Sequence, residues 1–155
     1  MKTNIFALIM ALLLTACNPS DSNAIQPYKE NEALPHPKIN IINLWASWCE
    51  PCRQEIPILS NFATQHPEVG VIGIAVDKRD NVAQFLQTQS VPYPIRYHEQ
   101  DATAVFLRFG NNTGGIPYTV IDAPQCNFRK AFFGKITAPK LEETLAQAKQ
   151  KCQVQ

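Results

Sequence analysis

Two cysteines, Cys49 and Cys52, stand three residues apart at the end of the segment Trp-Ala-Ser-Trp-Cys-Glu-Pro-Cys, residues 45–52. Thiols at this spacing can open and close a disulfide, or they can supply half of a zinc site. A zinc site would need a second Cys or His pair nearby. The other candidate ligands are scattered without ligand spacing: Cys126, Cys152, His36, His66 and His98. The motif therefore favours a redox-active dithiol over a metal site.

The flanking residues predict how the two thiols are held. The apolar, β-branched run at residues 39–45 is typical of a buried strand, and we expect a helix to follow it. Cys49 then lies at the helix N-terminus, where peptide dipoles and free N–H groups stabilise a thiolate. Cys52 lies one turn further on, and Pro51 suits the first turn because its missing N–H is not needed there. Only the Cys49 thiol is expected to be exposed.

This motif, followed by Glu55 and Pro57, resembles the TlpA/ResA branch of the thioredoxin superfamily. Members of that branch are membrane-tethered thiol-disulfide oxidoreductases of the bacterial envelope, and many serve cytochrome c maturation. The resemblance implies a thioredoxin-like α/β fold and an enzyme without a cofactor. It also implies two kinds of partner, namely disulfide-bearing envelope proteins such as apocytochrome c and a membrane thiol that donates electrons.

The resemblance assigns roles around the dithiol. Cys49 is expected to attack a partner disulfide, and Cys52 to resolve the mixed disulfide that forms. Thioredoxin has a buried aspartate two residues before the first Trp of the motif, but this chain has Asn43 there, which cannot accept a proton. Glu55 is the candidate base for Cys52; alternatively it shapes the partner surface or is an ordinary solvated charge. The residues expected to contact substrate beside Cys49 are Trp48, Glu50 and Pro51.

A second informative stretch is Asn-Asn-Thr-Gly-Gly-Ile-Pro-Tyr, residues 111–118. In a thioredoxin-like fold, a cis-proline in this place faces the active-site cysteines, and the resemblance assigns that role to Pro117. A cis bond leaves the adjacent backbone unpaired, so a substrate strand could pair with Ile116. The alternative is an ordinary trans-proline at the start of a strand.

The first 16 residues are predicted to be a lipoprotein signal peptide. Lys2 precedes an apolar block at residues 5–14, which as a helix would span about 15 Å, roughly half of a bilayer core, so a transmembrane anchor is disfavoured. Leu14-Thr15-Ala16-Cys17 resembles the bacterial lipoprotein cleavage site, in which Cys17 becomes the lipid-modified first residue. The alternative is a signal peptide that merely contains a cysteine. Lipid on Cys17 would tether the protein to a membrane on the periplasmic side of the envelope.

We interpret residues 17–37, which are polar and proline-bearing, as a flexible tether, and residues 38–152 as one thioredoxin-like domain. Fourteen basic and thirteen acidic residues give a net charge of +1, which does not favour nucleic-acid binding, and we expect a monomer. The periodicities predict an α/β fold, a central mixed sheet with helices on both faces. The expected strands are 39–45, 69–76, 94–97, 118–121 and 128–133, and the expected helices follow Cys49 or cover 80–89, 101–109 and 139–149.

The remaining cysteines, Cys126 and Cys152, are expected to form a structural disulfide. Cys126 lies at the tip of the last predicted hairpin. The final strand advances about 20 Å and the last helix returns about the same distance, which brings the end of that helix beside Cys126. The envelope is oxidising, and these two thiols have no other assigned role.

Two other functions remain open on the same superfold. A copper-delivery module usually spaces its cysteines by three residues and adds a distant histidine, for which His98 is the candidate. A thiol peroxidase would not need a resolving cysteine at this spacing. We favour a reductase of protein disulfides, because Glu50 places a negative charge beside Cys49, disfavours its thiolate and makes the disulfide harder to reduce.

Overall fold

The chain folds around a six-stranded sheet in the order β1-β4-β3-β2-β5-β6. The computed structural model describes residues 25–36 and 38–153. The pairs β1–β4, β4–β3 and β3–β2 are parallel, whereas β2–β5 and β5–β6 are antiparallel. The strands are β1 Gln26–Pro27, β2 Asn40–Trp45, β3 Gly70–Ala75, β4 Ile95–Tyr97, β5 Tyr118–Ala123 and β6 Phe128–Phe133.

Strand β2 is the inner strand from which the active-site segment leaves the sheet. All six of its residues are buried, as the continuous apolar run predicted. Its side chains alternate between two cores: Ile41 and Trp45 pack on one face of the sheet, and Ile42 and Leu44 on the other.

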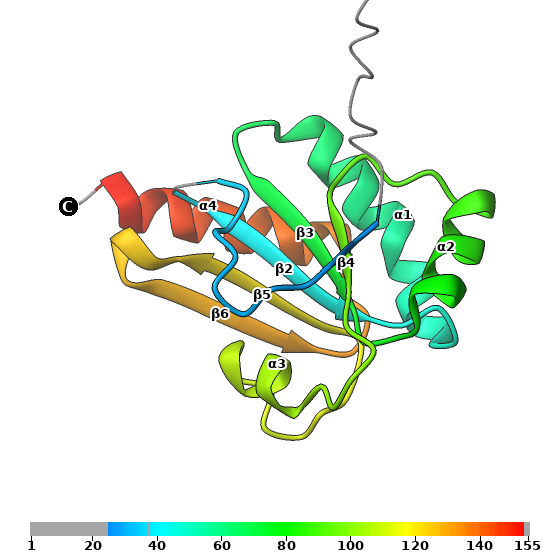
Figure 1. Ribbon diagram of the computed structural model, residues 1–155. Coiled ribbons are helices and arrows are strands. Elements are labelled where there is room, and N and C mark those ends of the chain that lie inside the picture. Colours follow the sequence, from blue (N-terminus) through cyan, green and yellow to red (C-terminus); the bar gives the residue numbers. More distant parts are fainter. Residues whose placement is uncertain (1–24, 37, 154–155) are drawn as a thin grey trace, which may run out of the picture.

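Helices cover both faces of the sheet. The core on the Trp45 face contains residues of α1 and α4, whereas the core on the Leu44 face contains Val105 of α3 (Figure 1). This is the mixed sheet with helices on both faces that the sequence predicted. The helices are α1 Glu50–Gln65, α2 Arg79–Thr88, α3 Thr103–Arg108, the short 3-10 turn η1 Pro124–Cys126, and α4 Ala138–Gln153.

The segment that precedes the domain is not the featureless tether that we expected, at least from residue 25 onward. Strand β1 pairs with β4, with Gln26 opposite Arg96. Arg96 Nε also donates to Glu32 Oε1 at 2.7 Å. The prediction was wrong for residues 25–36, because composition does not reveal pairing with a distant strand. Strand β1, and not β4, therefore forms this edge of the sheet.

Some predicted element boundaries were also wrong. Helix α3 begins at Thr103 rather than Asp101; Asp101 Oδ1 accepts the Thr103 N–H, but the residue at the cap position is Ala102. Helix α4 extends to Gln153 instead of ending near residue 149, and β5 continues to Ala123. Tertiary packing decides these ends, since Ala123 and the last turns of α4 lie against the same core.

The predicted signal peptide and the candidate lipidation site Cys17 lie outside the described residues. Among the helices that the structure describes, none combines the length and the apolar character needed to cross a bilayer.

A disulfide joins Cys126, at the end of η1, to Cys152, in the last turn of α4, with an S–S distance of 1.95 Å. The two cysteines are 26 residues apart in the sequence. Cys126 is buried in the core that contains residues of α1 and α4, and Cys152 packs against the same core. The bridge therefore ties the C-terminal helix to the β5–β6 connection.

We predict that Cys126→Ala/Cys152→Ala lowers the free energy of unfolding by about 3–4 kcal/mol, because the bridge restricts the unfolded chain over a loop of about 27 residues. Urea unfolding under non-reducing conditions measures the loss. Cys49→Ala/Cys52→Ala is the control, since its loop is far shorter and its loss should be smaller. Equal losses in the two double variants would contradict this account.

Candidate active site

Cys49 and Cys52 form a disulfide where the chain passes from β2 into α1, with an S–S distance of 2.01 Å. Cys49 is the N-cap residue of α1, with an extended backbone, and its Sγ accepts the Cys52 N–H at 3.3 Å. Pro51 occupies the first turn of the helix. A peptide N–H of the first helical turn therefore points at the Cys49 sulfur, an arrangement that stabilises a thiolate after reduction.

Both cysteines are buried in this oxidised form. Cys49 is 5% exposed and Cys52 is 1% exposed. We expected Cys49 to be exposed, and that prediction was wrong for the disulfide form. The reason is that the bridge draws Sγ of Cys49 against Cys52 and the core. The neighbouring side chains of Trp48, Glu50 and Pro51 are exposed, and Arg53 Nη1 lies 3.6 Å from Glu50 Oε2.

Asp77 fixes the loop that leads to Cys49. Its Oδ2 accepts the Ser47 N–H at 2.9 Å and the Ser47 hydroxyl at 2.6 Å. Its Oδ1 accepts the Lys78 N–H and the Asn81 amide. Burial alone would raise the pKa of Asp77, but the donors from Ser47, Asn81 and Lys78 lower it below its usual value. An ionised Asp77 therefore joins the start of α2 to the loop before the dithiol.

Glu55 lies one turn after Cys52 and is fully buried. Its Oε1 accepts the Asn43 amide at 2.7 Å and the Thr119 hydroxyl at 2.7 Å. Its Oε2 accepts the Ile136 N–H at 2.8 Å. An Asn side chain, a hydroxyl and a backbone amide all donate to Glu55, so both oxygens of its carboxylate form accept hydrogen bonds.

Burial nevertheless raises the pKa of Glu55, and the opposing effects of the Ile136 N–H, the Thr119 hydroxyl and the Lys135 charge do not cancel it. A buried carboxyl group with a raised pKa is suited to accepting and returning a proton. Among the alternatives left open by the sequence, the solvated helix charge is therefore wrong, because the side chain does not reach solvent.

The peptide bond between Ile116 and Pro117 is cis, as the resemblance led us to expect. In the antiparallel β2–β5 pair, Tyr118 lies opposite Leu44, so Pro117 precedes β5 at the end of β2 that leads to Cys49. The Pro117 carbonyl accepts the Gly134 N–H at 2.9 Å, whereas Ile116 is partly buried at the rim.

Asn111 holds the loop before the cis-proline. Its amide donates to the Gly115 carbonyl at 2.8 Å, and its Oδ1 accepts the Thr113 and Gly114 N–H groups. The Phe133 ring lies over Gly115 so closely that a Cβ there would clash with Phe133 Cε2. The close approach of the Phe133 ring therefore requires a glycine at position 115, and this contact holds the loop against the end of β6.

The sequence analysis missed three of these polar residues, namely Thr119, Asp77 and Asn111. It treated Asn43 only as a failed proton acceptor, whereas its amide donates to Glu55 and to Thr119 Oγ1. Two signs were available. Thr119 is a hydroxyl residue within the buried strand β5, and Asp77 comes shortly after the buried strand β3.

Comparisons with known proteins agree with this geometry. Residues 17–130 match the family model described as the AhpC/TSA family. The chain is 24% identical over 105 residues to the thiol-disulfide oxidoreductase ResA of Oceanobacillus iheyensis, covering 66% of this chain and 53% of that protein. It is 34% identical over 89 residues to the thiol:disulfide interchange protein DsbE of Allochromatium vinosum, covering 57% of this chain and 43% of that protein. The chain thus spans about half the length of these curated relatives.

A solved structure of a thioredoxin-related protein from Neisseria meningitidis serogroup B superposes with a TM-score of 0.70. It is 34% identical, and the match covers 79% of this chain and 93% of that one. The overall architecture is therefore thioredoxin-like.

We predict that Glu55→Gln alters how stability depends on pH. Since the pKa of Glu55 is raised in the folded state, the stability linked to its protonation is present below its unfolded pKa of about 4.3 and is lost as pH rises through the folded pKa. Replacing Glu55 removes that loss. The free energy of unfolding of the variant should therefore increase relative to that of the wild type as pH rises. Urea unfolding across this pH range, with disulfides intact, measures the difference.

The matched control is Glu30→Gln, because Glu30 is exposed and the substitution likewise removes one carboxyl group. Any hydrogen bond that the substituted amide at position 55 fails to make adds an offset that does not vary with pH. Parallel pH curves for the wild type and Glu55→Gln would contradict the prediction.

Proposed function

The chain belongs to the AhpC/TSA family, and we propose that it is a thiol-disulfide oxidoreductase that reduces disulfides in other proteins. The observation that carries the proposal is the pairing of a disulfide at a helix N-cap with a buried carboxyl group of raised pKa one turn further along the same helix. The first feature supplies a nucleophilic thiolate, and the second a proton acceptor for the other thiol.

The proposed reaction begins with the reduced dithiol. The Cys49 thiolate attacks a partner disulfide, forms a mixed disulfide and releases one partner thiolate. Glu55 takes the proton of the Cys52 thiol, and the Cys52 thiolate then attacks Sγ of Cys49. The mixed disulfide breaks, the second partner thiolate leaves, and the Cys49–Cys52 disulfide is restored. Two electrons pass to the partner, its two thiolates take up protons from water, and Glu55 gives the proton that it took from Cys52 back to solvent.

The partner is proposed to bind over the rim formed by Trp48, Glu50, Pro51, Ile116 and Pro117. Trp48 is 69% exposed, which is unusual for so large an apolar side chain. The cis bond at Pro117 leaves the Ile116 backbone at the rim, where an extended partner segment can pair with it. Trp48 then supplies apolar contact next to the reacting sulfur.

The location and the partners are further parts of the proposal. We place the mature protein on the periplasmic side of the bacterial envelope, held to a membrane by lipid on Cys17 and acting as a monomer. Apocytochrome c is the proposed substrate among disulfide-bearing envelope proteins, and a membrane thiol is the proposed donor. The sequence motif around Cys17 and the resemblance to ResA and DsbE support this placement.

Copper delivery, one of the two alternative functions, would need grouped metal ligands. Among the described residues, no three His, Cys, Asp or Glu side chains are grouped to hold a metal, and His98 Nε2 lies 3.1 Å from the Asp101 carbonyl. Copper delivery therefore has no specific observation in its favour. A peroxide-turnover assay separates a thiol peroxidase from the proposed reductase.

We predict that Cys52→Ala accumulates a mixed disulfide with its partner, because the thiol that resolves this intermediate is removed. Incubation of the reduced variant with an envelope extract, followed by non-reducing electrophoresis and mass spectrometry, identifies the trapped proteins. Cys49→Ala is the control and should trap none. Equal trapping by both variants would show that Cys49 is not the attacking residue.

We predict that the Cys49–Cys52 pair has a midpoint potential nearer to the thioredoxin value of about −270 mV than to the value of about −120 mV typical of a strong oxidant. The exposed Glu50 carboxylate next to Cys49 disfavours the thiolate, although Arg53 partly offsets its charge. Equilibration with glutathione buffers measures the potential. A midpoint above about −180 mV would make the protein an oxidant or isomerase.

We predict that Cys17→Ala abolishes membrane attachment, since lipid on Cys17 is the proposed anchor. Fractionation and detergent partitioning of the full chain, produced in a bacterium with lipoprotein processing, measure attachment. Cys152→Ala serves as the control for loss of a cysteine elsewhere. Membrane-bound Cys17→Ala would reject the anchor but leave the redox proposal intact.

A further inference from the structure

The chain between the end of β6 and the start of α4 runs along the rim of the proposed site. Gly134 donates its N–H to the Pro117 carbonyl at 2.9 Å. Two residues later, Ile136 donates its N–H to Glu55 Oε2 at 2.8 Å. Lys135 lies between these two backbone hydrogen bonds, so its backbone is held between the cis-proline and the N-terminal half of α1.

The Lys135 side chain places a positive charge next to the dithiol end of α1. It is exposed, and its Nζ donates to the side-chain Oε1 of Gln54 at 3.1 Å. Gln54 follows Cys52 by two residues on α1. The Lys135 charge is also felt at Glu55, whose pKa it lowers against the larger raising effect of burial. The ammonium group therefore lies beside the reacting residues while it remains open to solvent.

This charge is not neutralised at contact distance. Lys135 forms no ion pair with any carboxylate of the described residues, and its hydrogen-bond partner Gln54 is neutral. Arg53, a second cation near the motif, differs in this respect, because its Nη1 lies 3.6 Å from Glu50 Oε2. The charges of Arg53 and Glu50 offset each other, whereas the charge of Lys135 stays available to a partner.

Phe133 adds apolar surface on the other side of Gly134. Among the described residues three large apolar side chains are exposed, and Phe133 and Trp48 are two of them. The Phe133 ring lies over Gly115, in the loop that leads to the cis bond. Trp48 directly precedes Cys49. Exposed apolar groups thus lie both at the dithiol and at the loop with which an extended partner segment is proposed to pair.

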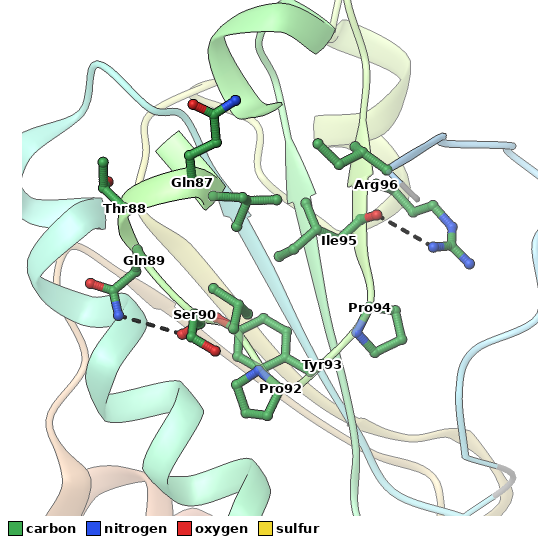
Figure 2. Close-up of a pocket in the computed structure, with 12 residues that line it drawn as sticks. Gln87, Thr88, Gln89, Ser90, Pro92, Tyr93, Pro94, Ile95 and Arg96 are labelled. Carbon is green, nitrogen blue, oxygen red and sulfur yellow. Dashed lines mark hydrogen bonds between the residues drawn. The ribbon is translucent and has the colours of Figure 1, made fainter. Parts of the chain in front are cut away.

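A pocket elsewhere on the protein does not contribute to this surface. It has a volume of about 830 Å³ and lies between the C-terminal end of α2 and β4 (Figure 2). Its lining consists of Ile25 and residues 86–96, and it includes neither cysteine of the motif nor any residue of the rim. Recognition beside the reacting sulfur therefore depends on the exposed side chains of the rim.

We propose that Phe133 and Lys135 extend the partner-binding surface along the end of β6, and that this surface selects partner segments with an acidic side chain close to the reacting cysteine. The inference rests on the proposed function, because it concerns the same dithiol and the same cis-proline. The occupant is an extended segment of a disulfide-bearing protein. Its carboxylate meets the Lys135 ammonium group, and a neighbouring apolar side chain lies against Phe133.

Charge complementarity favours an acidic segment over a basic one. A carboxylate beside Lys135 gains a charge-assisted hydrogen bond, whereas a lysine there would face a like charge. Glu50 carries the opposite charge at the rim, but Arg53 lies beside it. Exposed ion pairs are weak, so the selection is a preference of a few fold and not an absolute requirement.

The selection is tested with short peptides that carry a single cysteine as a 2-pyridyl disulfide. The Cys49 thiolate of the reduced full chain attacks the peptide sulfur, and the bond to the pyridyl sulfur breaks. Pyridinethiolate leaves with the bonding electron pair, takes up a proton from water, and is followed by the absorbance of the resulting thiopyridone. The peptides differ only at the two positions that lie two residues before and after the cysteine, which hold Glu, Gln or Lys. The rate that remains in Cys49→Ala is subtracted.

In the wild type at low ionic strength, we expect attack on the Glu peptides to be about three- to fivefold faster than attack on the Lys peptides. Lys135→Gln should make the two rates equal, and Lys135→Glu should reverse their order. Added salt should weaken the wild-type preference, because salt screens exposed charges.

Lys130→Gln is the matched control. Lys130 is an exposed lysine of the same strand, but its Nζ donates to Gln147 of α4 and not to the rim. The substitution removes the same charge and should keep the preference for Glu peptides.

Phe133→Ser tests the apolar part of the surface with peptides that hold Leu or Ser at the same two positions. We expect it to slow attack on the Leu peptides about threefold and to leave the Ser peptides unchanged, since only Leu loses apolar contact. Equal slowing of both sets would remove Phe133 from the surface.

Equal rates for Glu and Lys peptides in the wild type, or an undiminished preference in Lys135→Gln, would overturn the selection. Equal slowing of every peptide in Lys135→Gln would also overturn it, because Lys135 would then act on Glu55 and not on the partner. Each of these results leaves attack by Cys49 intact. Wild-type rates no higher than those of Cys49→Ala would instead count against the proposed function.

Discussion

The buried carboxylate of Glu55 is the interaction on which the rest of the site depends. Three separate segments donate to it: Asn43 from β2, Thr119 from β5 and the Ile136 N–H from the chain between β6 and α4. Burying a charge in an apolar core is costly unless hydrogen bonds compensate for it. The fold therefore has to bring these segments to the N-terminal half of α1, one turn past Cys52.

Two further polar residues hold the loops around the dithiol in place. Asp77 accepts four hydrogen bonds and fixes Ser47 before Cys49, and Asn111 fixes the turn that leads to the cis bond at Pro117. Neither residue is part of the proposed reaction. Both are largely buried, so their hydrogen bonds are little weakened by competition with water. Rigid loops on either side of a disulfide favour a defined approach of the partner sulfur.

The parallel and antiparallel halves of the sheet contribute different residues to the site. The parallel half, from β2 through β3 to β4, supplies Trp45, and Tyr93 in the segment before β4 belongs to the same core. The antiparallel half, β5 and β6, supplies Thr119, follows directly on Pro117 and leads to Ile136. Glu55 accepts hydrogen bonds from both sides of this boundary, from Asn43 on β2 and from Thr119 on β5.

Local patterns in the sequence were sufficient for most of the elements and for the dithiol. The β-branched run before the motif, the spacing of Cys49 and Cys52, and Pro51 in the first turn act over a few residues, so the strand, the N-cap and the redox pair could be predicted without a structure. The resemblance to a family added the cis bond at Pro117. The pairing of Cys126 with Cys152 needed only the lengths of one strand and one helix, together with the roles already assigned to the other cysteines.

Tertiary structure decided the environment of those residues. From the sequence, Glu55 could be a surface charge as easily as a buried base, because its burial is set by β5 and by Ile136, which lies 81 residues away. The pairing of β1 with β4 and the hydrogen bonds from Ser47 to Asp77 likewise join positions far apart in the chain. Short-range periodicity carries no information about such contacts, since they arise only when separate elements pack together. The sequence by itself thus determined which groups can react, and packing alone determined which of them are shielded from water.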